Sequence, residues 1–144
     1  APGLPYRITH DRRDSAASLY RFPGTHRRKT LILEKVATLP ALSSVTGGDI
    51  TQDGSMILLR DYFFAYGYFR PQGAGIPEAF GLPPCWVPLG MEAQGESLGV
   101  SPSGNEIYTA SEGMDGPIHK AGCALVRNQM NSRGKSAGGR NGIE

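Results

Sequence analysis

Two stretches of the chain, GGDITQDGSMILL at residues 47–59 and GESLGVSPSGNEIYT at residues 95–109, follow one pattern. Each has a small or acidic start, a short apolar run, a Ser or Thr, a turn that ends in glycine, and a second strand-like run. The turns, DG at 53–54 and SG at 103–104, are typical of two-residue β-hairpins because glycine readily adopts a positive φ. Aligning these turns offsets the copies by 50 residues. The pattern predicts an internal repeat, with two unrelated hairpins as the alternative.

The composition also favours β-structure. The 144 residues include 20 glycines and 11 prolines, about twice the usual share, which disfavours a helix bundle because both residues break helix interiors. Strand-like runs occur at residues 18–22, 29–36, 56–59, 63–69 and 85–89. Because residues 56–59 are continuously apolar, we expect that strand to be covered on both faces. An all-β, antiparallel fold is therefore predicted.

Charge and length exclude several classes of partner. The net charge of +2 is too small to indicate a nucleic-acid partner. The basic run at residues 26–29 precedes a predicted strand and is expected to form a solvated hairpin tip. No apolar run approaches the roughly 18 residues that span a bilayer, so no membrane span is expected. The sequence lacks a phosphate-binding loop.

The ends of the chain differ from its middle. Residues 1–16, with two prolines and a charged run, predict an extended and poorly anchored arm. Residues 128–144 are rich in glycine and poor in large apolar side chains, which predicts a flexible tail. Residues 71–84 form a long connection with four prolines and three glycines; connections of this length usually carry function or are loose.

Residues 17–120 resemble the C-terminal part of a group of secreted six-bladed β-propellers of TolB-like or WD40-like type. The segments VTGGDITQDG (45–54) and QGESLGVSPSGNEIYTASEG (94–113) carry the resemblance, although Gln52 and Ser103 replace the usual Pro and Asp of the turn. The resemblance implies a partial β-propeller over residues 17–127, built from antiparallel four-stranded blades. Residues 45–90 would form a complete blade, residues 17–39 the outer two strands of a preceding blade, and residues 95–127 most of a following one.

About two blades fall short of the four to eight that a closed propeller needs. The chain is therefore expected either to belong to a longer protein or to complete its fold with other chains, for example as a homotrimer that supplies six blades. The leading functional hypothesis is a non-enzymatic structural or binding module that assembles with other chains. The secreted family implies an extracellular or secretory compartment.

Three acidic residues, Asp49, Glu96 and Glu112, are candidate metal ligands. The resemblance places Asp49 and Glu96 where inner strands enter the central channel, and Glu112 after the second strand of the second copy. Converging carboxylates suit Ca²⁺, which takes six to eight oxygen ligands. Calcium-dependent propellers of phytase-like or lactonase-like type are similar in this respect, so a calcium-dependent hydrolase is the alternative function. Otherwise these carboxylates are solvated or paired with cations such as Arg60 and Lys120.

The aromatic residues Phe64, Tyr66, Tyr68 and Trp86 are candidate partner-binding residues. Alternation puts the first three on one face of a strand. Packing between blades is the other interpretation. A third hypothesis, carbohydrate binding, involves Trp86 and the 71–84 connection.

The two cysteines, Cys85 and Cys123, predict either one disulfide or two reduced thiols, because their separation in space cannot be obtained from the sequence. The three histidines are scattered and do not have the spacing of a zinc site. His119 is therefore expected to be a packed or surface imidazole.

Overall fold

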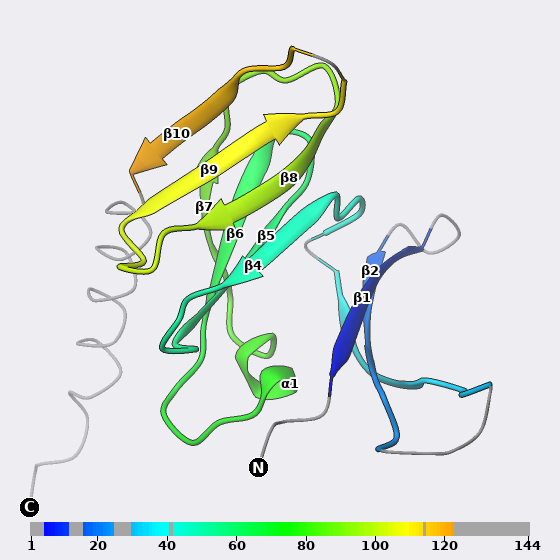
Figure 1. Ribbon diagram of the computed structural model, residues 1–144. Coiled ribbons are helices and arrows are strands. Elements are labelled where there is room, and N and C mark those ends of the chain that lie inside the picture. The colour runs from blue at the N-terminus through cyan, green and yellow to red at the C-terminus, as the bar shows by residue number, and fades with distance from the viewer. Residues whose placement is uncertain (1–4, 12–15, 25–29, 41, 114, 123–144) are drawn as a thin grey trace, which may run out of the picture.

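The protein is described by a computed structural model that covers residues 5–11, 16–24, 30–40, 42–113 and 115–122 (Figure 1). Its regular elements in these residues are β1 (Tyr6–Asp11), β2 (Ala16–Arg21), β3 (Glu34–Leu39), β4 (Gly47–Ile50), β5 (Met56–Arg60), β6 (Phe64–Phe69), α1 (Ile76–Ala79), β7 (Cys85–Pro88), β8 (Gly95–Val100), β9 (Glu106–Ser111) and β10 (Ile118–Gly122). The expected tail at residues 128–144 lies outside the described residues. No helix in the described ranges is both long and apolar enough to cross a membrane.

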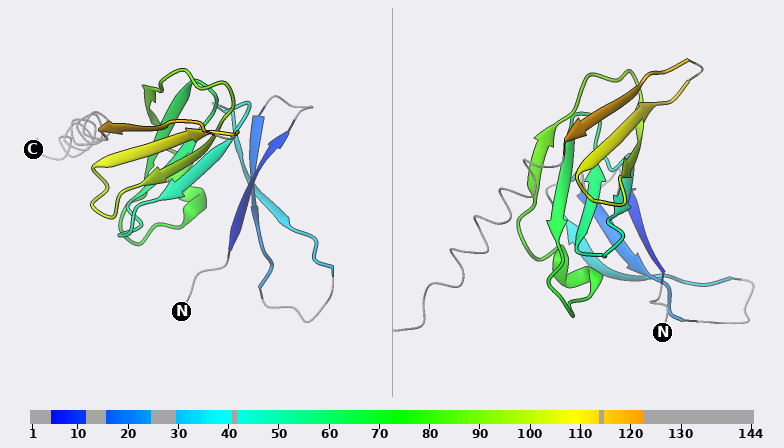
Figure 2. Two further views of the ribbon diagram at one scale, coloured as in Figure 1. Left: turned by 45° about the horizontal axis from the view of Figure 1, so that its top comes forward. Right: turned by 60° about the vertical axis from the view of Figure 1, so that its left-hand side comes forward.

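The strands form three antiparallel sheets, which confirms the all-β prediction. Their strand orders are β1-β2-β3, β4-β5-β6-β7 and β8-β9-β10, and every pairing between neighbours is antiparallel. The middle sheet, over residues 47–88, is the four-stranded unit that the sequence predicts at 45–90. It lies between the two three-stranded sheets, as two further views show (Figure 2).

Two predictions for the N-terminal region need correction. The expected arm contains a strand, β1, which pairs with β2 from Tyr6 to Asp11. The physical reason is the alternation of Tyr6 and Ile8, both packed against the core, with the polar Arg7 and Thr9. Conversely, the strand predicted at residues 29–36 begins only at Glu34.

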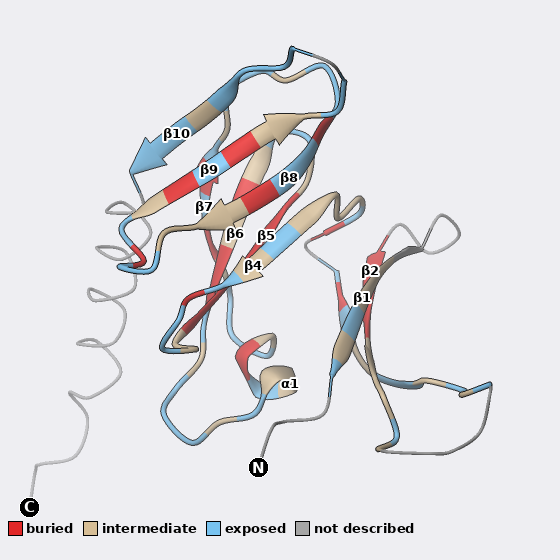
Figure 3. Cartoon of the chain, in the orientation of Figure 1, coloured by how far each residue is buried: buried red, intermediate tan, exposed pale blue. Residues whose placement is uncertain are grey.

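Two apolar clusters hold the sheets together. One joins the middle sheet to the third sheet through Leu58, Val87, Ile107 and their neighbours. The other joins it to the first sheet through side chains that include Leu19 and Ile57. Every residue of β5 is buried because both clusters draw on this strand, as predicted from its continuous apolar run (Figure 3).

The two glycine turns make matching hydrogen bonds, although neither is a two-residue hairpin. In the first turn the N–H of Gly54 donates to the carbonyl of Thr51, and in the second that of Gly104 donates to Ser101, at 2.7 Å in both. The φ angles of these glycines are +67° and +68°. The hydroxyls of Thr51 and Ser101 accept an N–H from the first residue of the next strand, at 3.1 Å in each turn. These hydroxyl bonds stabilise a longer loop than the sequence predicts.

The 71–84 connection packs against the core through a short helix. Ala79 of α1 is fully buried, and Phe80 contacts Tyr68 edge to face with ring centroids 4.7 Å apart. Arg70 anchors the start of the connection, because its guanidinium donates to the carbonyls of Gly54 at 2.6 Å and Ala74 at 2.7 Å. The helix thereby closes one end of the gap between the first and middle sheets (Figure 1).

Candidate binding groove

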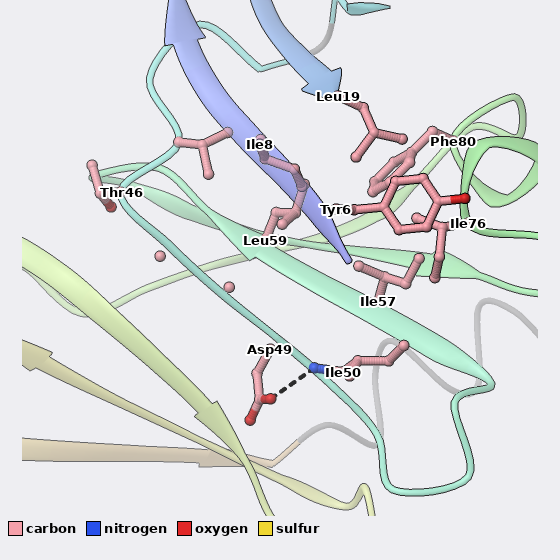
Figure 4. A pocket seen from close by; sticks show the side chains of 13 residues that line it. Tyr6, Ile8, Leu19, Thr46, Asp49, Ile50, Ile57, Leu59, Ile76 and Phe80 are labelled. Atoms are coloured by element: carbon pink, nitrogen blue, oxygen red, sulfur yellow. Dashed lines mark hydrogen bonds between the residues drawn. The ribbon is translucent and has the colours of Figure 1, made fainter. Parts of the chain in front are cut away.

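An apolar groove of about 570 Å³ lies between the first sheet and the middle sheet (Figure 4). Figure 4 shows β1 on one side of the groove, β4 and β5 on the other, and the side chains of the α1 region at its end. The residues that line it are Tyr6, Ile8, Leu19, Val45, Thr46, Gly47, Gly48, Asp49, Ile50, Ile57, Leu59, Ile76 and Phe80. The volume lies within the range of ordinary ligand pockets.

The apolar walls come from strand alternation on elements far apart in sequence. Tyr6 and Ile8 point to the same side of β1, while Ile57 and Leu59 point to the same side of β5. β4 adds little bulk to the groove because Gly47 and Gly48 have no side chains. A Cβ at Gly48 would lie 2.7 Å from a methyl group of Leu59, so β4 packs closely against β5.

Among the residues that line the groove, only Asp49 carries a charge, and backbone groups already engage its carboxylate. The N–H of Ile50 donates to Oδ1 and the N–H of Val100 donates to Oδ2, both at 2.8 Å. The second bond joins β4 to β8. The hydroxyl of Thr46, directly before β4, also donates to the carbonyl of Gly95 in β8 at 2.7 Å. Asp49 therefore stabilises the contact between two sheets and leaves the groove chemistry apolar.

The outer faces of the first and third sheets carry polar groups. On the third sheet, Glu106 accepts hydrogen bonds from Tyr108 at 2.7 Å and from Lys120 at 3.0 Å, and these bonds lower the pKa of Glu106. On the first sheet, the face opposite Leu19 carries Ser18 and its direct strand partners Thr9 and Thr38. The exposed large apolar side chains of the strands are distributed over several elements. Ile50 lies at the groove, while Phe69, Trp86 and Ile118 lie on β6, β7 and β10.

The predicted metal ligands do not converge. Glu96 and Glu112 are exposed, and Asp49 is committed to the two backbone N–H groups. Within the described residues, no three His, Cys, Asp or Glu side chains are grouped closely enough to hold a metal ion. Of the cations considered as their partners, Lys120 pairs with Glu106, and Arg60 pairs with Glu92, which the sequence analysis did not single out.

The Arg60–Glu92 ion pair is buried where the middle and third sheets meet. The two groups are 2.8 Å apart, with side-chain exposures of 0% and 1%. Arg60 also donates to the carbonyl oxygens of Asp61 and Ser97, both at 3.0 Å, while Thr109 donates to the other carboxylate oxygen of Glu92. Burial alone raises the pKa of Glu92, but the bonds from Thr109 and Arg60 outweigh burial and lower it overall.

The aromatic candidates divide into a buried and an exposed group. Tyr68 is only 3% exposed and belongs to the core cluster, so the structure favours the core-packing interpretation for this residue. Phe64 and Trp86 meet edge to face at 5.2 Å, and Trp86 is 56% exposed. The phenol of Tyr66 donates to Asp61 at 2.8 Å; burial and then this bond raise its pKa. Trp86 is thus the member of the set most open to a partner.

The remaining candidates are less informative. Cys85 is buried in β7, and Cys123 lies outside the described residues, so the disulfide stays a prediction. His119 is half-buried on β10, consistent with a packed imidazole. The groove itself was missed by the sequence analysis; the alternation of Tyr6 and Ile8 within the expected arm was its available signal.

Comparisons with known proteins identify no family. The chain matches no protein-family model and no curated protein. Among solved structures it is similar to a Trichoderma reesei enzyme of carbohydrate-active enzyme family AA12, with a TM-score of 0.35 and 16% sequence identity. The similarity covers 76% of this chain and 33% of the enzyme, so the chain spans about a third of that protein's length. A similarity of this level establishes neither a shared fold nor a shared activity.

Proposed function

We propose that the chain is a non-enzymatic structural or binding module that assembles with other protein chains in an extracellular or secretory compartment. The observation that supports this proposal is the apolar groove beside β1, a strand at the edge of its sheet. Edge strands offer unpaired backbone N–H and C=O groups to another strand. An uncovered apolar surface next to such an edge is typical of an association site.

The sheet composition supports the same proposal. We interpret the middle sheet, which has four strands, as a complete propeller blade and the two three-stranded sheets as parts of its neighbouring blades. In the middle and third sheets, the first strands β4 and β8 lie side by side, joined by the bond from Val100 to Asp49. The first sheet has no counterpart of these strands within the described residues. Other chains would supply what the ring lacks, as a homotrimer or a larger assembly.

The solution mass tests this proposal. Light scattering on the full chain should give a mass well above the 15.4 kDa of one copy, and about three times that mass for a homotrimer. Ile50, which is 42% exposed in the groove, provides the variant Ile50→Lys, and the fully exposed Met91, which does not line the groove, provides the matched control Met91→Lys. Loss of mass in the first variant but not the second supports assembly through the groove. A native chain that stays at 15.4 kDa at high concentration, alone and with its source extract, contradicts the proposal.

The calcium-dependent hydrolase alternative has a separate test. It requires Ca²⁺ to be held by Asp49, Glu96 and Glu112, so added Ca²⁺ should raise the melting temperature of the native chain but not of Glu96→Ala. Because Glu96 is exposed, this substitution should not itself disturb the fold. Equal melting temperatures with and without Ca²⁺ would remove the alternative.

A further inference from the structure

An exposed apolar segment, residues 30–33 (Thr-Leu-Ile-Leu), lies beside the first sheet without belonging to it. We call these residues the apolar arm. Their composition is typical of a strand, yet β3 begins only after them, at Glu34. Ile32 is 90% exposed, while Leu31 and Leu33 are half-buried. The arm therefore has the chemistry of a strand but no strand partner in the described sheets.

The arm points away from the groove of its own molecule. Its C-terminal end is fixed because Arg21 and Glu34 are direct strand partners and form an ion pair at 2.6 Å. From this base the arm extends away from the other two sheets, as both Figure 1 and Figure 2 show. An intramolecular contact with the groove would require the end of the β2–β3 ladder to open.

The groove offers what the arm lacks. Among the described strands, β1 lies at the edge of its sheet, so the backbone groups on its outer side are available to a further strand. The apolar side chains of Ile57, Leu59 and Phe80 face the space beside it. An uncharged segment with large apolar side chains matches a groove whose only charged residue, Asp49, is already held by two backbone N–H groups.

We infer that the apolar arm of one copy of this chain binds in the groove of a second copy and adds a strand beside β1. This inference rests on the proposed assembly function and names its partner and contact. Main-chain hydrogen bonds to β1 supply affinity in this mode, and the alternating side chains of the arm supply specificity. Because the arm and the groove are different surfaces, the contact is heterologous and generates a ring when its rotation closes.

The test combines a mass measurement with a peptide. Ile32→Asp removes the exposed apolar side chain of the arm, and Met91→Asp is the matched control, since Met91 is fully exposed and does not line the groove. We expect light scattering to show a single copy for Ile32→Asp and the native mass for Met91→Asp. Folding of both variants is checked by circular dichroism, and neither position is buried.

The peptide tests the groove directly. A fluorescent peptide of residues 29–35 should bind saturably to the Ile32→Asp protein, whose groove is intact. The same peptide with Asp in place of Ile32 should bind at least about tenfold more weakly, because a buried isoleucine contributes strongly to affinity. Absence of saturable peptide binding overturns the inference, as does an Ile32→Asp protein that keeps the native mass.

The two proposals fail in different ways. If Ile32→Asp keeps the native mass while Ile50→Lys loses it, assembly through the groove stands and the arm is not its occupant. If the native chain is monomeric, both the assembly function and the binding of the arm by a second copy are contradicted.

Discussion

Removing the carboxylate of Glu92 should destabilise the fold more than removing an exposed acidic group. Arg60 and Glu92 are 2.8 Å apart and almost completely buried. In Glu92→Ala the guanidinium keeps its bonds to the carbonyl oxygens of Asp61 and Ser97, but it loses its counter-ion. Its Nη2 already has no hydrogen-bond partner, so the variant would bury an uncompensated positive charge.

The expected loss follows from this geometry. Breaking a buried pair by deleting one partner costs about 3–5 kcal/mol, a large part of the roughly 5–15 kcal/mol that stabilises a typical domain. Replacing both residues, as in Arg60→Met with Glu92→Leu, should recover most of that loss because neither charge then remains buried. The measurement is urea unfolding at pH 7, followed by circular dichroism, with the free energies compared at equal slope.

The exposed pair of Lys120 and Glu106 provides the control. Its side chains are 59% and 39% exposed, so Glu106→Ala should leave the urea midpoint nearly unchanged. If Glu92→Ala destabilised the protein no more than Glu106→Ala, or the double replacement were less stable than Glu92→Ala, the reasoning from burial would be refuted.

The pH dependence has a defined sign. Because the pKa of Glu92 in the folded protein lies below its ordinary value of 4.5, the ionised carboxylate stabilises the fold above pH 4.5. That contribution is lost as the pH falls through the folded pKa. The stability difference between the native protein and Glu92→Gln should therefore narrow below pH 4.5; a constant difference would contradict the role of the charge.

Three further predictions concern buried or strained positions. Gly95→Ala should cost at least the roughly 1–3 kcal/mol of overpacking, because its Cβ would overlap Nη2 of Arg60. Gly122→Ala, with no atom within 4 Å, is its control in urea unfolding. Gly54→Ala should lower the melting temperature because φ there is +67°; an unchanged value would contradict that strain. Burial raises the pKa of Tyr68 to about 12. Tyr68→Phe should therefore remove part of the tyrosinate absorbance that develops near pH 12. Loss of the absorbance that develops near pH 10 would contradict the effect of burial.

The elements that could be predicted from sequence are those fixed by local pattern. The continuous apolar run at residues 56–59 predicts a strand buried on both faces, and β5 is that strand. The positions of the two glycine turns were predicted correctly, but their predicted length was too short. The side-chain hydroxyls of Thr51 and Ser101 stabilise longer loops. Such hydrogen bonds between a side-chain hydroxyl and the backbone can be predicted from the sequence only when the bonded residue is already known.

The groove could not be predicted because it depends on how two sheets diverge. Its walls come from residues 6–8, 57–59 and 76–80, which no short-range pattern connects. Glu92 was not predicted as a partner of Arg60 for the same reason. Glu92 lies in the segment between β7 and β8, whereas Arg60 lies at the end of β5 in the middle sheet. Tyr68 illustrates the converse, because its face of β6 was predicted but not which sheet would cover it.

The distribution of polar groups limits where a partner can bind. A chain whose outer faces were meant to pack against further sheets would carry apolar side chains on them, as solenoid interiors do. Here the outer face of the third sheet carries the linked Glu106, Tyr108 and Lys120 beside the exposed Ile118. Desolvating these groups would oppose stacking of another sheet. A ring that closes against this face would have to keep these groups hydrogen-bonded. Association through the groove beside β1 avoids that requirement, because an added strand there satisfies backbone groups and covers apolar side chains together.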